Sequence, residues 1–178
     1  GSTSDMQAVT SWRVSPCPLY LSSKELRFFT DLGPHLLSFY RGLNRLYTES
    51  VKGIQPTWVA GYLDQGKPAA LVQYSRMKRF RDTLPAVIRP DIIPTQDGMM
   101  ITELDSVPGG IGLTACLSRI YHDLDGDHAQ IIGGPHGMIR GFARMLRSLQ
   151  DQQGGCIAIL VSDESKDYRP EMSWLTAQ

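Results

Sequence analysis

Residues 86–105, AVIRPDIIPTQDGMMITELD, decide how the rest of the sequence is interpreted. β-Branched and apolar residues run through 86–93 and again through 99–105, and the turn-forming sequence Thr95-Gln-Asp-Gly98 lies between them. Two such runs joined by a short loop that contains glycine are typical of a β-hairpin. The segment therefore predicts an antiparallel pair of strands.

The polar residues of this hairpin are candidates for a functional site: Arg89, Asp91, Glu103 and Asp105. Residues two apart in a strand share a face, so each strand contributes one pair. A three-residue loop, Gln96–Gly98, would place Asp91 opposite Glu103. The same register would place Arg89 opposite Asp105. A two-residue loop would instead shift the pairing by one residue and scatter the side chains over both faces.

In the three-residue register, the carboxylates and the guanidinium converge, with opposed Cβ atoms about 5 Å apart. The carboxylates repel one another, and Arg89 alone supplies too little positive charge to compensate. Mg²⁺ is a natural partner, because it takes a few carboxylates together with substrate phosphates. The pattern thus predicts a metal and phosphate site of the kind that holds magnesium-ATP. The alternative is an exposed polar face with an ordinary Arg–Asp ion pair, since surface charges are common.

Helical patterns surround the hairpin. Residues 22–47 have serine N-caps and apolar residues at helical spacings, and Gly33-Pro34 is expected to split them into two helices. The other predicted helices are Pro56–Asp64, a segment from Pro68 towards Phe80, Leu113–Tyr121 and Met138–Leu149. The predicted fold class is α+β, with a helical N-terminal part packed on an antiparallel hairpin.

An apolar run, Cys156–Val161, lies near the end of the sequence. Continuous hydrophobicity of this length is typical of a strand buried on both faces in a parallel sheet. The stretch from Tyr168 then begins a helix, giving one βα unit with no second strand. A lone βα unit cannot cover its own sheet edges, so we expect the chain to be a fragment.

A glycine-rich segment, Pro108-Gly-Gly-Ile-Gly-Leu-Thr114, follows the acidic strand and opens a helix. Glycines let backbone N–H groups approach an anion, and a helix N-terminus favours negative charge. The segment matches neither the Walker pattern nor G-x-G-x-x-G. Taken alone it is better explained as a tight connection, whereas its position beside the carboxylates strengthens the phosphate-binding interpretation.

The bulk composition argues against several classes of protein. Eighteen Lys and Arg residues balance eighteen Asp and Glu residues, so no net field favours nucleic acid or an anionic membrane. The basic run Arg76–Arg81 contains a single aromatic residue, Phe80, and no interleaved aromatic platform, and it is interpreted as a solvated helix face. Three cysteines without C-x-x-C spacing fit a reducing cytoplasm. No apolar stretch approaches ~18 residues and no leader opens the chain, so membrane spanning and secretion are not expected.

The sequence Arg89-Pro-Asp91, followed by Thr102-Glu-Leu-Asp-Ser-Val-Pro-Gly-Gly110, resembles the circularly permuted ATP-grasp proteins related to glutathionylspermidine synthetase. In that family an R-x-D strand is followed, twelve residues after its aspartate, by E-x-N, and Glu103 stands at this spacing. The second motif ends here in Asp105 instead of asparagine, which keeps an oxygen ligand and adds a negative charge. The resemblance is specific over 87–121 and weaker over 156–175.

The resemblance implies roles for the hairpin and the residues after it. Its metal ligands would be Asp91, Glu103 and Asp105. Arg89 would steady the transferred phosphoryl group as the catalytic and ATP-binding residue. The cofactor-binding segment would continue through Ser106, Gly109 and Gly110, close to the acyl substrate. With ATP and Mg²⁺ as cofactors, a small-molecule carboxylate would be activated as an acyl phosphate and attacked by an amine, with no nucleic-acid or membrane partner.

The same resemblance implies a domain order. Residues 1–10 would be a tag scar and polar tail, 11–153 a partial ATP-grasp domain with the metal-binding hairpin, and 154–178 the truncated start of a Rossmann-like pre-ATP-grasp domain. No segment resembles the family's lysine-bearing strands or adenine pocket, which are expected in a missing C-terminal portion of the same polypeptide. The leading hypothesis is a fragment of a cytoplasmic ATP-dependent carboxylate–amine ligase, inactive alone. The alternative is a non-catalytic binding or assembly domain whose acidic patch contacts a partner.

Overall fold

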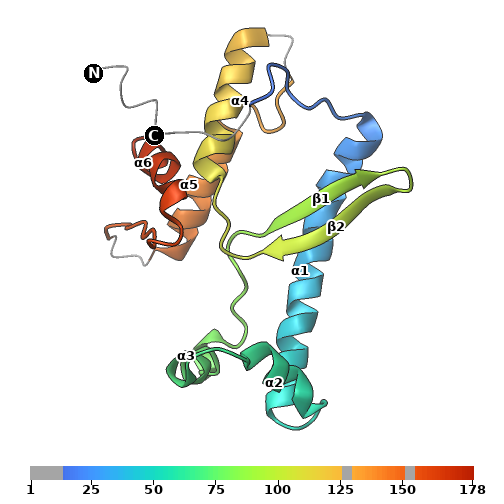
Figure 1. Ribbon diagram of the computed structural model, residues 1–178, viewed down its shortest axis with the longest axis vertical. Helices are drawn as coiled ribbons and strands as arrows, with labels where there is room; N and C mark the ends of the chain where they lie inside the picture. The colour runs from blue at the N-terminus through green and yellow to red at the C-terminus, as the bar shows by residue number, and fades with distance from the viewer. Residues whose placement is uncertain (1–13, 126–129, 151–154) are drawn as a thin grey trace. The chain divides into compact units, whose positions relative to one another are not determined.

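The computed structural model describes residues 14–125, 130–150 and 155–178 (Figure 1). Its elements in chain order are α1 (Ser23–Val51), α2 (Thr57–Asp64), α3 (Ala69–Ser75), the 3₁₀ helix η2 (Lys78–Phe80), β1 (Arg89–Thr95), β2 (Gly98–Asp105), α4 (Ile111–Asp125), α5 (Gly137–Leu149), the 3₁₀ helix η4 (Lys166–Tyr168) and α6 (Arg169–Thr176). The chain is therefore α+β, as predicted.

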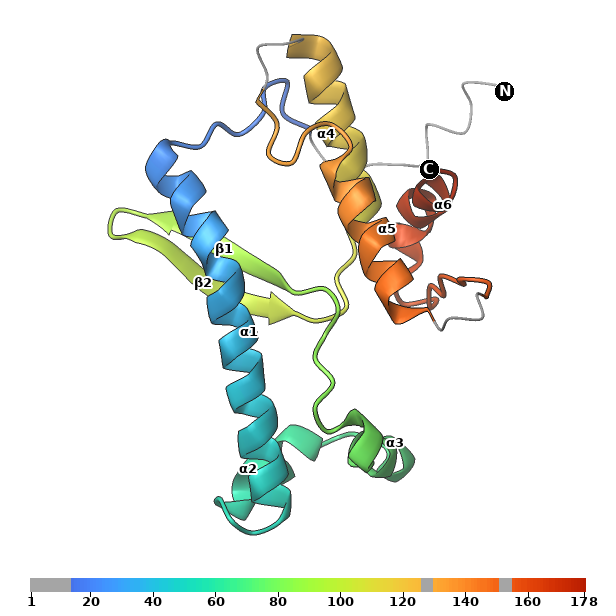
Figure 2. The ribbon, with the colours of Figure 1, turned by 180° about the vertical axis from the view of Figure 1, so that it is seen from behind.

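The chain divides into two compact units. Residues 22–108 form one unit, with α1 to α3 and the hairpin, and the described residues of 14–21 and 109–178 form the other. In the first unit, α1 runs across one face of the two-stranded sheet, behind it in Figure 1 and in front of it in Figure 2. The predicted tail 1–10 and the predicted boundary at 153–154 fall on residues outside the described part.

Helix α1 is continuous, so the predicted split at Gly33-Pro34 is wrong. A capping box starts the helix: Ser22 Oγ accepts a hydrogen bond from the Glu25 N–H (3.3 Å), and the Glu25 carboxylate accepts one from the Ser22 N–H (2.7 Å). Pro34 lies inside the helix, where its missing N–H removes one backbone hydrogen bond. The apolar residues keep helical spacings on both sides of Pro34, so their pattern is compatible with a single helix.

The predicted helix from Pro68 towards Phe80 is also wrong in its second half. α3 ends at Ser75, whose hydroxyl donates to the Val72 carbonyl (2.9 Å), and η2 follows separately. The rings of Tyr74 and Phe80 are 4.6 Å apart. Residues six apart lie on different sides of a continuous α-helix, so this ring contact requires the helix to break between them.

A buried serine fixes the end of α1 to α2. Ser50 is 1% exposed, and its hydroxyl donates to the Pro56 carbonyl (2.6 Å) and accepts from the Ala60 N–H (3.0 Å). The buried apolar residues in the described part of this unit are Leu36, Val59 and Ala60. Because this apolar core is small, a polar link between helices contributes a large share of the stability.

Replacing Ser50 with alanine is expected to lower the free energy of unfolding by about 1–3 kcal/mol, because the buried Ala60 N–H loses its acceptor. Urea denaturation followed by circular dichroism measures the change. Ser75→Ala removes a hydroxyl from an exposed position and should stay within about 0.5 kcal/mol of the unchanged chain. Equal effects of the two substitutions would contradict the role given to Ser50.

In the second unit, α4 packs against both α5 and α6. The buried apolar residues of its described part are Ile111, Ala115 and Leu175. Gly112 lies against the backbone of α6, where an added Cβ would be 2.4 Å from the Glu171 carbonyl oxygen. Helices α4 and α6 therefore approach each other backbone to backbone at Gly112.

The predicted strand at Cys156–Val161 is wrong. Residues 155–162 form neither helix nor strand, and Leu160 is 93% exposed. In the described part of the chain the sheet consists of β1 and β2. A strand satisfies its backbone groups by pairing with a neighbour, so hydrophobicity alone does not form one. The predicted helices before and after this run are present as α4, α5 and α6.

None of the helices within the described residues combines the length and the apolar character needed to cross a membrane.

Candidate functional site: the β1–β2 hairpin

The pairing of β1 with β2 changes register once along its length. Near the turn, Thr95 pairs with Gly98, so the loop has two residues and the predicted three-residue loop is wrong. A β-bulge then follows between Asp91 and Ile92. The bulge leaves Thr102 without a partner in the register, and its hydroxyl donates to the Asp91 carbonyl (3.1 Å). One extra residue on β2 thus offsets the shorter loop.

Beyond the bulge, the pairing predicted for the candidate residues is confirmed. Asp91 is opposite Glu103, and Arg89 is opposite Asp105. Directly opposed side chains lie on the same face of the sheet. Because of the bulge, the opposed side chains lie on one face of the sheet, which a two-residue loop without a bulge would not allow.

Arg89 lies between the two aspartates. Its Nε is 3.1 Å from Asp91 Oδ1, and its Nη2 is 3.4 Å from Asp105 Oδ2. The side chains of the three residues are between 30% and 44% exposed. Ion pairs at this exposure contribute about 0–1 kcal/mol each, so a ligand can replace them at little cost.

Asp105 and Ser106 are also held by the surrounding chain. The other oxygen of Asp105, Oδ1, accepts a hydrogen bond from the Val107 N–H (2.8 Å). The Ser106 hydroxyl is 2.8 Å from the Tyr40 hydroxyl of α1. The end of β2 is therefore anchored to α1, which fixes the side of the hairpin that carries Asp105.

The carboxylates of the hairpin do not form an all-protein metal cage. Among residues 14–125, 130–150 and 155–178, no three or more His, Cys, Asp or Glu side chains are grouped so that they could hold a metal ion. Mg²⁺ bound together with phosphates needs only one or two carboxylates. The opposed pair Asp91 and Glu103 supplies two hard oxygen donors, which fits that second kind of site.

The glycine-rich segment after the hairpin belongs to the other unit, and its backbone already has an anionic partner. Glu171 of α6 accepts hydrogen bonds from the Gly110 N–H (2.5 Å) and from the Leu113 N–H (2.7 Å). A carboxylate at a helix N-terminus is stabilised by the free N–H groups and the helix dipole. In this structure the start of α4 is thus occupied by a side chain of the same protein.

The close packing of this segment agrees with a tight connection. Gly110 has a φ of +85°, and a Cβ on Gly109 would be 2.3 Å from the Tyr168 ring. Sequence reasoning missed Glu171, because it lies 61 residues from Gly110 and no local spacing links the two. Of the residues predicted for the site, the structure brings Arg89, Asp91, Glu103 and Asp105 together on the hairpin, with Ser106 next to them.

No family model matches this chain, and no curated protein or solved structure matches it significantly. The similarity to circularly permuted ATP-grasp proteins therefore stays a prediction carried by the motif of residues 89–110.

Proposed function

We propose that the β1–β2 hairpin is the magnesium- and phosphate-binding part of an ATP-dependent carboxylate–amine ligase of the circularly permuted ATP-grasp type. The observation that supports this best is the register: Asp91 faces Glu103 and Arg89 faces Asp105. A partial ATP-grasp domain over 11–153 and the start of a Rossmann-like domain over 154–178 belong to the same proposal. So do a carboxylate and an amine as substrates.

In this proposal Asp91 and Glu103 hold Mg²⁺, and Asp105 completes the acidic face. The ion, when bound, neutralises phosphate charge during phosphoryl transfer. Arg89 exchanges its two weak aspartate contacts for phosphate oxygens, with which a guanidinium forms short bidentate hydrogen bonds. In this proposal the chain binds phosphate but does not catalyse the ligase reaction, because no segment of it resembles the family's lysine-bearing strands.

The proposal predicts that ATP binding to this chain includes an event that requires Mg²⁺. Asp91→Asn and Glu103→Gln should each weaken Mg²⁺-dependent binding at least about tenfold, a loss of about 1.4 kcal/mol, because each removes a charged oxygen ligand. Isothermal titration calorimetry with ATP, with and without Mg²⁺, measures both effects.

Asp97→Asn is the matched control, since Asp97 lies exposed in the turn of the same hairpin and its substitution removes the same charge. It should leave the affinity within about twofold, because a solvent-exposed charge at that distance is screened. Equal losses in all three variants, or ATP titrations that are identical with and without Mg²⁺, would contradict the proposal.

The second candidate is a non-catalytic binding or assembly domain with an acidic surface patch. The observation that favours it is the pair of half-exposed Arg–Asp contacts, which are common on ordinary protein surfaces. Calorimetry in which the chain responds to neither Mg²⁺ nor nucleotide would support this alternative over the ligase.

A further inference from the structure

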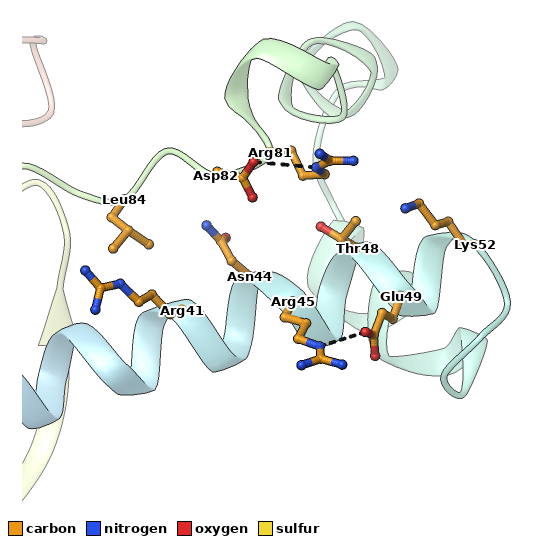
Figure 3. Close-up of a pocket in the computed structure, with 9 residues that line it drawn as sticks. All are labelled: Arg41, Asn44, Arg45, Thr48, Glu49, Lys52, Arg81, Asp82 and Leu84. Carbon is orange, nitrogen blue, oxygen red and sulfur yellow. Dashed lines mark hydrogen bonds and ion pairs between the residues drawn. The ribbon is translucent and has the colours of Figure 1, made fainter.

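A groove with a volume of about 550 Å³ lies in the unit 22–108, away from the residues assigned above (Figure 3). One wall is the C-terminal half of α1, and the other is the segment 81–84 that follows η2. The Asn44 side chain donates a hydrogen bond to the Thr83 carbonyl (3.0 Å). This bond holds the two walls together although they are distant in the sequence.

The groove is lined by more cations than carboxylates. Its charged residues are Arg41, Arg45, Lys52 and Arg81 against Glu49 and Asp82. Arg41 and Arg45 of α1 and Lys52, its C-cap residue, follow spacings of four and seven residues, which place their Cα atoms along one side of the helix. Figure 3 shows Arg81 and Asp82 on the segment that runs alongside α1, with Lys52 on the side toward this segment and the Arg45–Glu49 pair directed away from it.

The two carboxylates offset only part of this positive charge. Glu49 accepts hydrogen bonds from Arg45 Nε (2.7 Å) and from the Gln55 amide (3.3 Å). The bond from Arg45 lowers the pKa of Glu49 and raises the pKa of Arg45, so this pair stays ionised. Asp82 is only loosely paired, 3.7 Å from Arg81 Nε.

Two cations of the groove form no close ion pair among the described residues, although the charge of Lys52 also helps to lower the pKa of Glu49. Within the part of the chain that the structure describes, neither Arg41 nor Lys52 has an ion-pair partner within 4.0 Å. The surplus is local: residues 41–84 contain eight Lys or Arg and three Asp or Glu, a net charge of +5, whereas residues 85–108 have a net charge of −3. A surplus of one sign along a concave surface raises the local concentration of oppositely charged ligands.

We propose that this groove binds a small ligand that carries two or more phosphate groups. Arg41 and Lys52 are eleven residues apart on α1, which is about 16 Å along the helix axis. A single phosphate cannot reach both side chains, whereas separated phosphates can contact one each. Arginine binds phosphate oxygens through a planar fork of donors and lysine binds them as a point charge, so both ends can hold phosphate groups.

The test uses sodium tripolyphosphate and inorganic phosphate as probes in calorimetry, at ~0.15 M salt and with EDTA. The salt screens the general field of the protein, and EDTA removes the Mg²⁺ on which the hairpin site depends. The chain is expected to bind one tripolyphosphate with saturation, at least about tenfold more tightly than phosphate. Arg41→Gln/Lys52→Gln should weaken tripolyphosphate binding at least about tenfold, and Arg81→Gln should weaken it by a smaller factor.

Lys24→Gln/Lys67→Gln is the matched control, because it removes the same charge from the same unit at positions that do not line the groove. It should change the affinity by less than about twofold. Equal weakening by the two double variants, or no saturable binding, would overturn the proposal. So would a single-stranded oligonucleotide that displaces tripolyphosphate and binds the Arg41→Gln/Lys52→Gln variant unchanged, which would identify a nucleic-acid surface instead. Because ATP also carries linked phosphates, the ATP titrations of the hairpin are repeated in the Arg41→Gln/Lys52→Gln variant. A Mg²⁺-dependent binding event that remains in this variant belongs to the hairpin, so the two assignments are tested separately.

Discussion

Replacing Gly112 with alanine is expected to lower the free energy of unfolding of the unit that contains α4 and α6 by about 2–3 kcal/mol. The added Cβ would lie 2.4 Å from the Glu171 carbonyl oxygen and 2.9 Å from its carbonyl carbon. These are backbone atoms inside a helix, so no side-chain rotation relieves the clash. The two helices must separate instead.

Separation of α4 from α6 has further consequences at both ends of the contact. It exposes Ala115, which is 0% exposed, and Leu175, which is 7% exposed. It also pulls the Glu171 carboxylate away from the start of α4, where it satisfies two backbone N–H groups. Urea denaturation followed by the fluorescence of Trp174, with Trp12 and Trp58 replaced by phenylalanine, reports on this unit.

Gly141→Ala provides a control for which the expected change in the free energy of unfolding has the opposite sign. Gly141 lies inside α5, and nothing lies within 4 Å of the position its Cβ would take. Alanine there should raise the free energy of unfolding by about 0.5–1 kcal/mol, because it restricts the unfolded chain and favours the helix. If Gly112→Ala were also stabilising, the backbone contact between α4 and α6 would be wrong.

The hairpin shows which part of a fold local sequence can predict. Apolar runs on either side of a turn sequence predicted the strands, and the pairing of Asp91 with Glu103 was predicted correctly. The loop length was not, because the turn sequence at 95–98 is compatible with loops of two or three residues. The bulge at Thr102 compensates for the shorter loop, and no local sequence pattern predicts this bulge.

Three other features that local sequence did not predict depend on residues that are distant in the chain. The apolar run Cys156–Val161 has the composition of a strand, but a strand requires a partner that composition does not provide. The start of α4 has the composition of an anion-binding loop, and its anion is Glu171 from a helix near the end of the sequence. The groove along α1 was not predicted either, because the hydrogen bond that joins its walls links Asn44 to Thr83, 39 residues away in the sequence.

Replacing Asp64 with asparagine is expected to lower the free energy of unfolding of the unit 22–108 by about 2–3 kcal/mol at pH 7. The Asp64 side chain is 13% exposed and accepts hydrogen bonds from the Tyr47 hydroxyl (2.9 Å) and from Arg76 Nη2 (2.5 Å). Arg76 also donates to the Tyr47 hydroxyl (3.2 Å). Asp64 thus links the end of α2 to α1 and to the residue that follows α3, and its loss leaves Arg76 without its carboxylate.

The effect should depend on pH in a defined direction. Burial acts to raise the pKa of Asp64, but the hydrogen bonds from Tyr47 and Arg76 outweigh it and lower the pKa below its ordinary value. A carboxyl group whose pKa is lower in the folded state stabilises the fold above the unfolded pKa, about 3.9. That contribution is lost as the pH falls from about 4 towards the lower, folded-state pKa.

Urea denaturation at pH values between about 7 and 3 measures this dependence. The free energy of unfolding of the unchanged chain should exceed that of Asp64→Asn by a constant amount from pH 7 to about 5. This excess should shrink below about pH 4, because the Asp64 carboxyl then becomes protonated in the unfolded state. Asp31→Asn, at an exposed position on α1, should change the free energy of unfolding by no more than about 0.5 kcal/mol at pH 7. If the loss in free energy of unfolding caused by Asp64→Asn is the same at pH 3 as at pH 7, the charge of Asp64 is not what holds Arg76 and Tyr47 in place. The loss would then come from the shape and hydrogen bonding of asparagine.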